Sequence, residues 1–160
     1  MGWLGVACKL MKIMIASILP KRASLAGPAS EMLQGYLERG SRYVPVSHRV
    51  FANEGALLSF LEDNAGRTRP ALLLGDSRGK QMSSEELAAE VVRLQDAGNQ
   101  LLVLGIGPAD GWTQEALKRA NLTIAFGRIT LPHELAAVVA AEQIYRALTI
   151  RAGHPYHSGH

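Results

Sequence analysis

The sequence predicts an α/β fold in which one mostly parallel sheet is covered by helices on both faces. Apolar runs of strand length alternate with helical segments from residue 12 to about residue 150. The runs at 71–75 and 100–106 are apolar without interruption, which is typical of parallel strands buried on both faces. The chain has 160 residues, of which 48% are hydrophobic and 19% charged, so one domain with a full core is expected.

The first half of the chain is predicted to contain, in order, a strand at 12–19, a helix at 28–39, a strand at 43–51, a helix at 54–64 and a strand at 71–75. β-Branched residues in KIMIASIL favour the first strand. Pro28 suits the first position of a helix. Pro45 removes a ladder donor, so the second strand is expected at an edge of the sheet.

Ser83 and Glu86 have the spacing of a capping box and predict the start of a helix that ends at Gly98. The remaining predicted elements are a strand at 100–106, a short helix at 113–120, a strand at 122–126 and a long helix from Pro132 to about Ile150. Strand and helix therefore alternate along the whole chain, which indicates a parallel sheet with crossover helices.

Three glycine-containing loops follow predicted strands, at 75–80, 105–112 and 126–133. Ligands of parallel α/β sheets bind beyond the carboxyl ends of the strands, so these loops are the candidate binding site. The alternative is that the glycines only form tight turns. A dinucleotide site is disfavoured, because Gly105, Gly107 and Gly111 are spaced G-x-G-x-x-x-G and no acidic residue lies about twenty positions further on.

The composition indicates in which cellular compartment the protein works and which kinds of partner it binds. The lone cysteine, Cys8, cannot form an internal disulfide, so a cytoplasmic protein is expected. We interpret residues 1–10 as an N-terminal extension and residues 11–160 as a single domain; the apolar run after residue 12 is too short for a convincing signal peptide. No run approaches the ~20 apolar residues of a membrane span. The net charge of +3 and pI of about 9.2 favour a polyanion partner only weakly.

The last predicted helix carries Glu142 and Arg146 four residues apart, in the order that favours an intrahelical ion pair. The final seven residues, HPYHSGH, contain three of the five histidines. A chelating site made by His154, His157 and His160 is one alternative for this tail, although no cysteine or carboxylate accompanies them.

The segment ITLPHELAAVVAAEQIYRALTIRAGHPYH resembles the C-terminal signature of the RlmH family, the ribosomal RNA large-subunit pseudouridine methyltransferases of the SPOUT class. The residues that match in order are Thr130, Leu131, Pro132, His133, Glu142, Gln143, Tyr145, Arg146, Ala147, Pro155, Tyr156 and His157. The resemblance covers residues 11–157 and is strongest in the last third. It implies a trefoil knot near the C-terminus, a homodimer, S-adenosylmethionine as methyl donor, and ring nitrogen 3 of a pseudouridine in 23S ribosomal RNA as acceptor.

The resemblance also implies which residues form the site. No metal site is expected. The cofactor contacts would fall at Gly75, Gly107, Phe126, Gly127, Arg128, Ile129, Thr130 and Leu131. Glu142, Arg146, Tyr156 and His157 would serve catalysis on the substrate side. We expect His157 to help remove the proton from the attacking nitrogen and Arg146 to hold a phosphate or the developing charge on the base.

Two further expectations follow from the same resemblance. The tail is expected to be mobile and to close over bound RNA, and the small residues Ala136, Ala137, Ala140 and Ala141 are expected to permit close approach of a second subunit. The alternative function is a knotted homologue that binds RNA or S-adenosylmethionine without catalysis, because Pro108 and Ala137 replace residues usual in the family.

Overall fold

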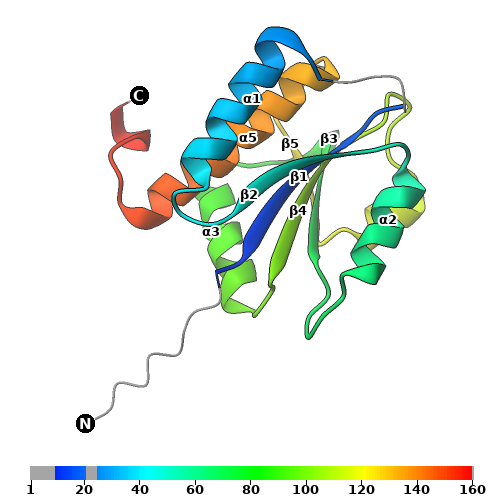
Figure 1. The fold of residues 1–160 in the computed structure, drawn as a ribbon, viewed down its shortest axis with the longest axis horizontal. Coiled ribbons are helices and arrows are strands. Elements are labelled where there is room, and N and C mark those ends of the chain that lie inside the picture. Colours follow the sequence, from blue (N-terminus) through cyan, green and yellow to red (C-terminus); the bar gives the residue numbers. More distant parts are fainter. Residues whose placement is uncertain (1–9, 21–24, 160) are drawn as a thin grey trace.

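Five parallel strands form one sheet in the order β2-β1-β4-β3-β5 (Figure 1). The structure is a computed structural model that describes residues 10–20 and 25–159. The predicted N-terminal extension therefore lies, apart from Leu10, outside the described residues. The mostly parallel α/β fold predicted from the sequence is confirmed, whereas the trefoil knot and the domain limits stay predictions.

Every strand and helix expected from the sequence is present. In chain order the elements are β1 (Lys12–Ile18), α1 (Gly27–Gly40), β2 (Val46–Phe51), α2 (Glu54–Asp63), β3 (Ala71–Gln81), α3 (Ser84–Asp96), β4 (Leu101–Ile106), α4 (Gln114–Arg119), β5 (Leu122–Ala125), α5 (His133–Ala152) and a short 3-10 helix, η1 (His157–Gly159). The capping box of α3 is complete, since Ser83 and Glu86 each accept a hydrogen bond from the other's backbone N–H. No helix in the described ranges is long and apolar enough to cross a membrane.

The second strand lies at an edge of the sheet, as Pro45 predicts, but it begins later than expected. β2 starts at Val46 because the residues before it form a turn, which the Ser41 hydroxyl closes by donating to the carbonyl of Val46. The Pro45 carbonyl still accepts a hydrogen bond from the backbone N–H of Ile13 at 2.9 Å. Pro45 therefore still accepts a bond from β1 although it has no N–H to donate.

The third strand is longer than the sequence predicts and includes the segment expected to be a loop at 75–80. β3 pairs with β5 through Gly75, loses register, and pairs again through Lys80 opposite the same residue, Ile124. Gly79 lies within this irregular part, where a Cβ would stand 2.7 Å from the backbone carbon of Thr123. The backbones approach so closely that only glycine fits.

Helices cover both faces of the sheet. Alternate residues of β3 point to opposite sides: Leu73 packs in the core beneath α1, α3 and α5, whereas Leu72 and Leu74 pack in the core beneath α2 and α4. α5 packs against both α1 and α3 on its side of the sheet (Figure 1). All three leucines are fully buried, which explains the uninterrupted apolar run.

The alanines expected to admit a second subunit are mostly used inside the chain itself. Ala137, Ala140 and Ala141 are 0%, 0% and 1% exposed, so these side chains face the chain's own core. Their small size allows α5 to lie close to its neighbours in the same layer. The expectation that they form a dimer contact is therefore wrong for these three residues.

Candidate functional site

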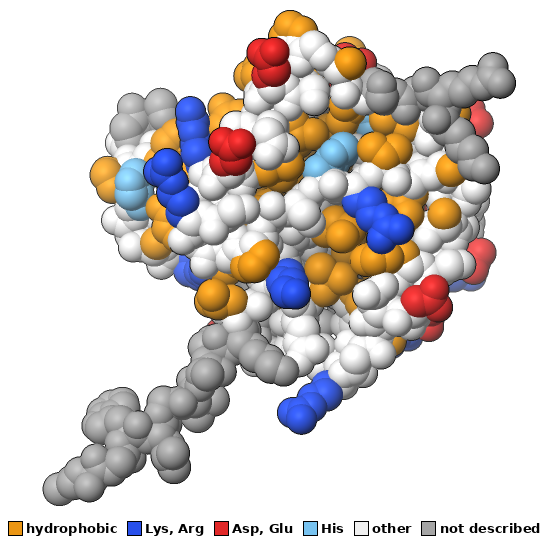
Figure 2. All heavy atoms as spheres, in the orientation of Figure 1, with side chains coloured by type: hydrophobic (Ala, Val, Ile, Leu, Met, Phe, Trp, Pro, Cys, Tyr) orange, Lys and Arg blue, Asp and Glu red, His pale blue; other side chains and the backbone are white. Residues whose placement is uncertain are grey.

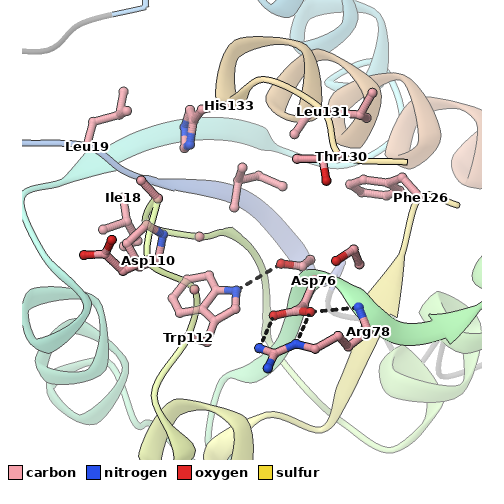
Figure 3. Close-up of a pocket in the computed structure, with 18 of the residues that line it drawn as sticks. Ile18, Leu19, Asp76, Arg78, Asp110, Trp112, Phe126, Thr130, Leu131 and His133 are labelled. Atoms are coloured by element: carbon pink, nitrogen blue, oxygen red, sulfur yellow. Dashed lines mark hydrogen bonds and ion pairs between the residues drawn. The ribbon is translucent and has the colours of Figure 1, made fainter. Parts of the chain in front are cut away.

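A cavity of about 620 Å³ opens at the carboxyl ends of the strands (Figure 3). Its wall includes residues of all three loops singled out from the sequence. It also includes Ile18, Leu19 and Pro20 at the end of β1, which the sequence did not single out. The volume and the mainly apolar lining with a few polar groups are typical of a small-molecule site.

Seven of the eight residues expected to contact a cofactor line this cavity. They are Gly75, Gly107, Phe126, Gly127, Ile129, Thr130 and Leu131. Gly127 has a φ of 96°, a left-handed conformation that favours glycine, and it turns the chain between β5 and α5. Arg128 is the exception, because its side chain is exposed and it is not part of the wall.

Trp112 joins two of the loops that form the cavity, and the sequence analysis did not identify it. Its indole N–H donates a 3.0 Å hydrogen bond to the carbonyl of Gly75. Its ring lies against Gly105 and Gly107, where an added Cβ would come within 3.1 Å and 2.8 Å of ring atoms. The usable signal was the pattern GIGPADGW, in which glycines alternate along the strand end just before an aromatic residue.

Asp76 and Arg78 form the ion pair visible beside the indole in Figure 3. Asp76 Oδ1 accepts hydrogen bonds from the backbone N–H and from Nε of Arg78, at 2.8 Å and 3.0 Å, and Oδ2 accepts one from NH2 at 2.9 Å. These bonds with Arg78 hold the pKa of the Asp76 carboxyl below its usual range. The cavity therefore has a fixed negative group whose guanidinium partner faces solvent.

His133 lines the cavity at the start of α5, and its Nε2 is buried with no hydrogen-bond partner among the described residues. Burial lowers the pKa of the imidazole, and the nearby backbone of Gly107 offsets part of this effect by raising it. His48 on β2 lies close enough to be influenced by His133, and its pKa is lowered by burial and by that second ring. His48 Nε2 is 2.8 Å from the hydroxyl of the fully buried Ser17. Both histidines are thus held neutral at neutral pH.

The four residues expected to serve catalysis form one hydrogen-bonded cluster at the far end of α5. Arg146 donates from Nε and NH2 to Glu142 Oε1, at 2.9 Å and 2.6 Å. The hydroxyl of Tyr156 donates to the same oxygen at 3.1 Å, and Nδ1 of His157 lies 3.1 Å from Arg146 NH1. The Arg146 guanidinium also stacks over the Tyr156 ring at 4.8 Å.

The tail is folded back on its own chain instead of extending freely. Gly153 ends α5 in a left-handed conformation, with a φ of 71°, and reverses the chain direction. The ring of Tyr156 then packs against Tyr145 at 4.7 Å, and His157 Nε2 lies 2.7 Å from Glu85 on α3. Burial and the Glu142 carboxylate raise the pKa of Tyr156 to about 12, so its hydroxyl remains a donor.

The tail cluster and the cavity lie at opposite ends of α5. Ala136 lines the cavity, and Arg146 lies ten residues further along the helix, about 15 Å away at 1.5 Å per residue. None of the four clustered residues is among the described residues that line the cavity. Of the tail histidines, His154 accepts a hydrogen bond from the backbone of Tyr156, and His160 lies outside the described residues.

Comparison with known proteins identifies the kind of molecule that this sequence resembles. Residues 11–157 match the family described as "Predicted SPOUT methyltransferase". A "Ribosomal RNA large subunit methyltransferase H" of Koribacter versatilis is 53% identical over 125 residues, which cover 78% of this chain and 85% of that protein. A protein of the same name from Mesorhizobium japonicum is 40% identical over 146 residues, covering 82% of this chain and 91% of its own length.

The fold is also similar to a solved structure. The SpoU methyltransferase AviRb from Streptomyces viridochromogenes, crystallised in complex with the cofactor AdoMet, superposes with a TM-score of 0.52 at 13% sequence identity. The match covers 91% of this chain and 60% of that chain. At this identity the similarity concerns the fold alone.

Proposed function

Because the chain belongs to the SPOUT methyltransferase family, we propose that it transfers a methyl group from S-adenosylmethionine to 23S ribosomal RNA. The acceptor that fits the family resemblance is ring nitrogen 3 of a pseudouridine. The observation that carries the proposal is the cavity itself: loops chosen from the sequence as cofactor contacts converge on one concave site at the carboxyl ends of the strands. A ribosomal substrate implies that the protein works in the cytoplasm.

The residues of the cavity suit the donor. Its sulfonium supplies a methyl group that an attacking nitrogen can take in one in-line displacement: the nitrogen–carbon bond forms as the carbon–sulfur bond breaks. Phe126 and Leu131 offer apolar surface for an adenine ring or a thioether chain, and the main chain at Gly75 and Gly107, which lines the cavity, offers polar groups. The protein's contribution is alignment of donor and acceptor, so no nucleophilic serine or cysteine is needed.

The tail cluster suits the acceptor. The attacking ring nitrogen must lose its proton, and His157 provides an imidazole for that transfer, either directly or through a water molecule. Arg146 provides a guanidinium for the negative charge that develops on the base or for a neighbouring phosphate. Glu142 and Tyr156 hold Arg146 in one orientation through the bonds to Glu142 Oε1.

A homodimer can bring the cavity and the tail cluster together in one site. Within one chain the cavity and the tail cluster are separated by about 15 Å of α5. A second copy packed against the first can bring its tail to the cavity of its neighbour, so that each site takes the cofactor from one chain and the acid–base groups from the other. Light scattering at micromolar concentration tests this part, and a strictly monomeric species would contradict it.

The decisive experiment separates an enzyme from a homologue that only binds. Titration calorimetry with S-adenosylmethionine measures binding, and a radiolabelled methyl assay on ribosomes that lack this modification measures transfer. Binding with transfer supports the proposal. Binding without transfer identifies the non-catalytic alternative, for which the replacement residues Pro108 and Ala137 are the sequence argument. Ala137 is fully buried in the chain's own core, so only Pro108 lies in the cavity wall.

A further inference from the structure

We propose that Trp112 is a positioning residue that holds the irregular part of β3, which begins at Gly75, and the loop after β4 in the shape that binds S-adenosylmethionine. The inference rests on the proposed function, because it concerns affinity for the cofactor. It goes beyond the contacts expected from the family resemblance, among which Trp112 does not appear.

The first support is the hydrogen bond between the indole and the point in β3 where its regular pairing stops. The Trp112 N–H donates to the carbonyl of Gly75 at 3.0 Å, and Gly75 is the last residue of β3 that pairs with both β4 and β5 before the register breaks. Beyond this point Asp76 and Arg78 leave the regular ladder and enter the cavity wall. The indole therefore fixes the carbonyl at the point where the regular strand gives way to the irregular segment that lines the cavity.

The second support is the packing of the ring against the end of β4. A Cβ on Gly107 would stand 2.8 Å from Nε1 and 2.9 Å from Cε2 of the indole, and one on Gly105 would stand 3.1 Å from Cζ2. Gly107 cannot carry a side chain while the ring is in place, and at Gly105 the ring adds to the closer approach of Leu74 Cδ2, which would stand 2.9 Å from the added Cβ. Both have negative φ, so it is the space occupied by neighbouring side chains, Trp112 at Gly107 and Trp112 with Leu74 at Gly105, and not an unusual backbone conformation, that requires glycine here.

The third support is the anchoring of Trp112 itself. Its side chain is only 6% exposed and packs in the core beneath α2 and α4. The next residue, Thr113, is tied to α2 because its backbone N–H donates to Glu54 Oε1 at 2.9 Å and its hydroxyl donates to Oε2 at 2.5 Å. The ring is thus fixed by its packing in the core and by the bonds between Thr113 and α2. Its indole atoms contact Gly75 of β3 and Gly105 and Gly107 at the end of β4.

These contacts give Trp112 a role that differs from ordinary core packing. The main chain at Gly75 and Gly107 lines the cavity, and its polar groups are useful to a ligand only if they point in a fixed direction. When a loop becomes ordered only on ligand binding, the loss of conformational entropy weakens the affinity for the ligand. By fixing both strand ends in advance, Trp112 reduces that loss.

The test uses Trp112→Phe, which keeps an aromatic ring but removes the N–H donor. We expect the Kd for S-adenosylmethionine to rise about five-fold, as for one lost hydrogen bond, while kcat at saturating cofactor stays near that of the wild type. The matched control is Leu61→Ala. Leu61 is 1% exposed and belongs to the same core cluster as Trp112, but it does not line the cavity. This variant should lower the melting temperature and leave Kd at 25 °C unchanged.

A second measurement keeps the wild-type indole. The chain has two tryptophans, and Trp3 lies outside the described residues, so a Trp3→Phe protein has Trp112 as its single indole fluorophore. Saturating S-adenosylmethionine should shift the emission of Trp112, with a midpoint equal to the calorimetric Kd. An unchanged emission spectrum, an unchanged Kd in Trp112→Phe, or an equal rise of Kd in Leu61→Ala would overturn the inference. If the wild-type protein binds no S-adenosylmethionine, the proposed function fails and the inference fails with it.

Discussion

Tyr156 donates its hydroxyl hydrogen to Glu142 Oε1 at 3.1 Å, and this bond ties the end of the chain to the helix fourteen residues earlier. The same oxygen accepts two bonds from Arg146. A segment expected from the sequence to be free is therefore part of a fixed polar cluster. This arrangement changes what truncation and substitution of the tail should do.

Tyr156→Phe should lower the free energy of unfolding by about 1 kcal/mol, because it removes one hydrogen bond while Arg146 continues to satisfy Glu142. Deleting residues 156–160 should cost more, since the ring contacts with Tyr145 and Arg146 are lost as well. Urea unfolding measures both. A truncated protein as stable as the wild type would mean that the folded-back tail contributes nothing in solution.

Arg146→Ala should lower the free energy of unfolding by about 3 kcal/mol, because the side chains of Arg146 and Glu142 are only 15% and 16% exposed and Glu142 loses its cationic partner. The double variant with Glu142→Gln should recover part of the loss, since no unpaired charge then remains. Arg93→Ala is the control, because that guanidinium is 61% exposed in its pair with Glu90, and it should behave like the wild type. Equal effects of Arg93→Ala and Arg146→Ala would contradict the argument.

Stability should fall as the pH is lowered from 8 to 5. The pKa values of His48 and His133 are depressed in the folded protein below the ordinary value of 6.5, so the unfolded chain binds protons first. Their contribution is therefore fully present above pH 6.5 and is lost as the pH falls from 6.5 through the depressed folded values. His48→Asn should reduce the pH dependence measured by urea unfolding, whereas the exposed control His154→Asn should retain it. A steeper dependence in His48→Asn would show that the sign is wrong.

Gly79→Ala should destabilise the fold by about 3 kcal/mol or more, because its Cβ would stand 2.7 Å from a backbone atom of β5 and the two strands would have to separate. Gly35 is the matched control. It lies inside α1 with nothing within 4 Å of an added Cβ, so Gly35→Ala should stabilise the protein by about 0.5–1 kcal/mol. Thermal and urea unfolding of both variants check the pair, and a tolerated Gly79→Ala would exclude the close strand approach.

Arg128→Ala should weaken RNA binding without affecting the Kd for S-adenosylmethionine. Arg128 is exposed beside the cavity-lining residues Gly127 and Ile129, and no ion pair of the described residues includes it. A free guanidinium at this rim suits a phosphate, and its loss should reduce the salt dependence of log Kd for a structured RNA by about 0.7–0.9. The control is Arg69→Ala, because the Arg69 guanidinium is already paired with Glu62. A raised cofactor Kd in Arg128→Ala would instead support the cofactor contact expected from the sequence.

The local sequence alone determined the order of elements and the capping box of α3. Each of these depends on neighbours within a few residues, as with Ser83 and Glu86 or the apolar run of β3. It also determined which loops follow the buried strands, because parallel topology places all carboxyl ends at one edge. The long C-terminal signature predicted the family, which is confirmed, and the cofactor contacts from Phe126 to Leu131, which stay a prediction; all of these residues except Arg128 line the cavity.

The tertiary structure decided what depends on contacts between distant segments. Trp112 lies 37 residues from the carbonyl that it binds, and Gly79 owes its identity to β5, so neither of these two long-range contacts is visible in the local sequence. The buried face of α5 was misassigned for the same reason: alanines suit close packing against any partner, and only the assembled sheet shows that Ala137, Ala140 and Ala141 face the chain's own core. The folded-back tail likewise depends on Glu142, fourteen residues before Tyr156, and on Glu85 of α3, whose carboxylate comes within reach of His157 only after α3 and α5 have packed together.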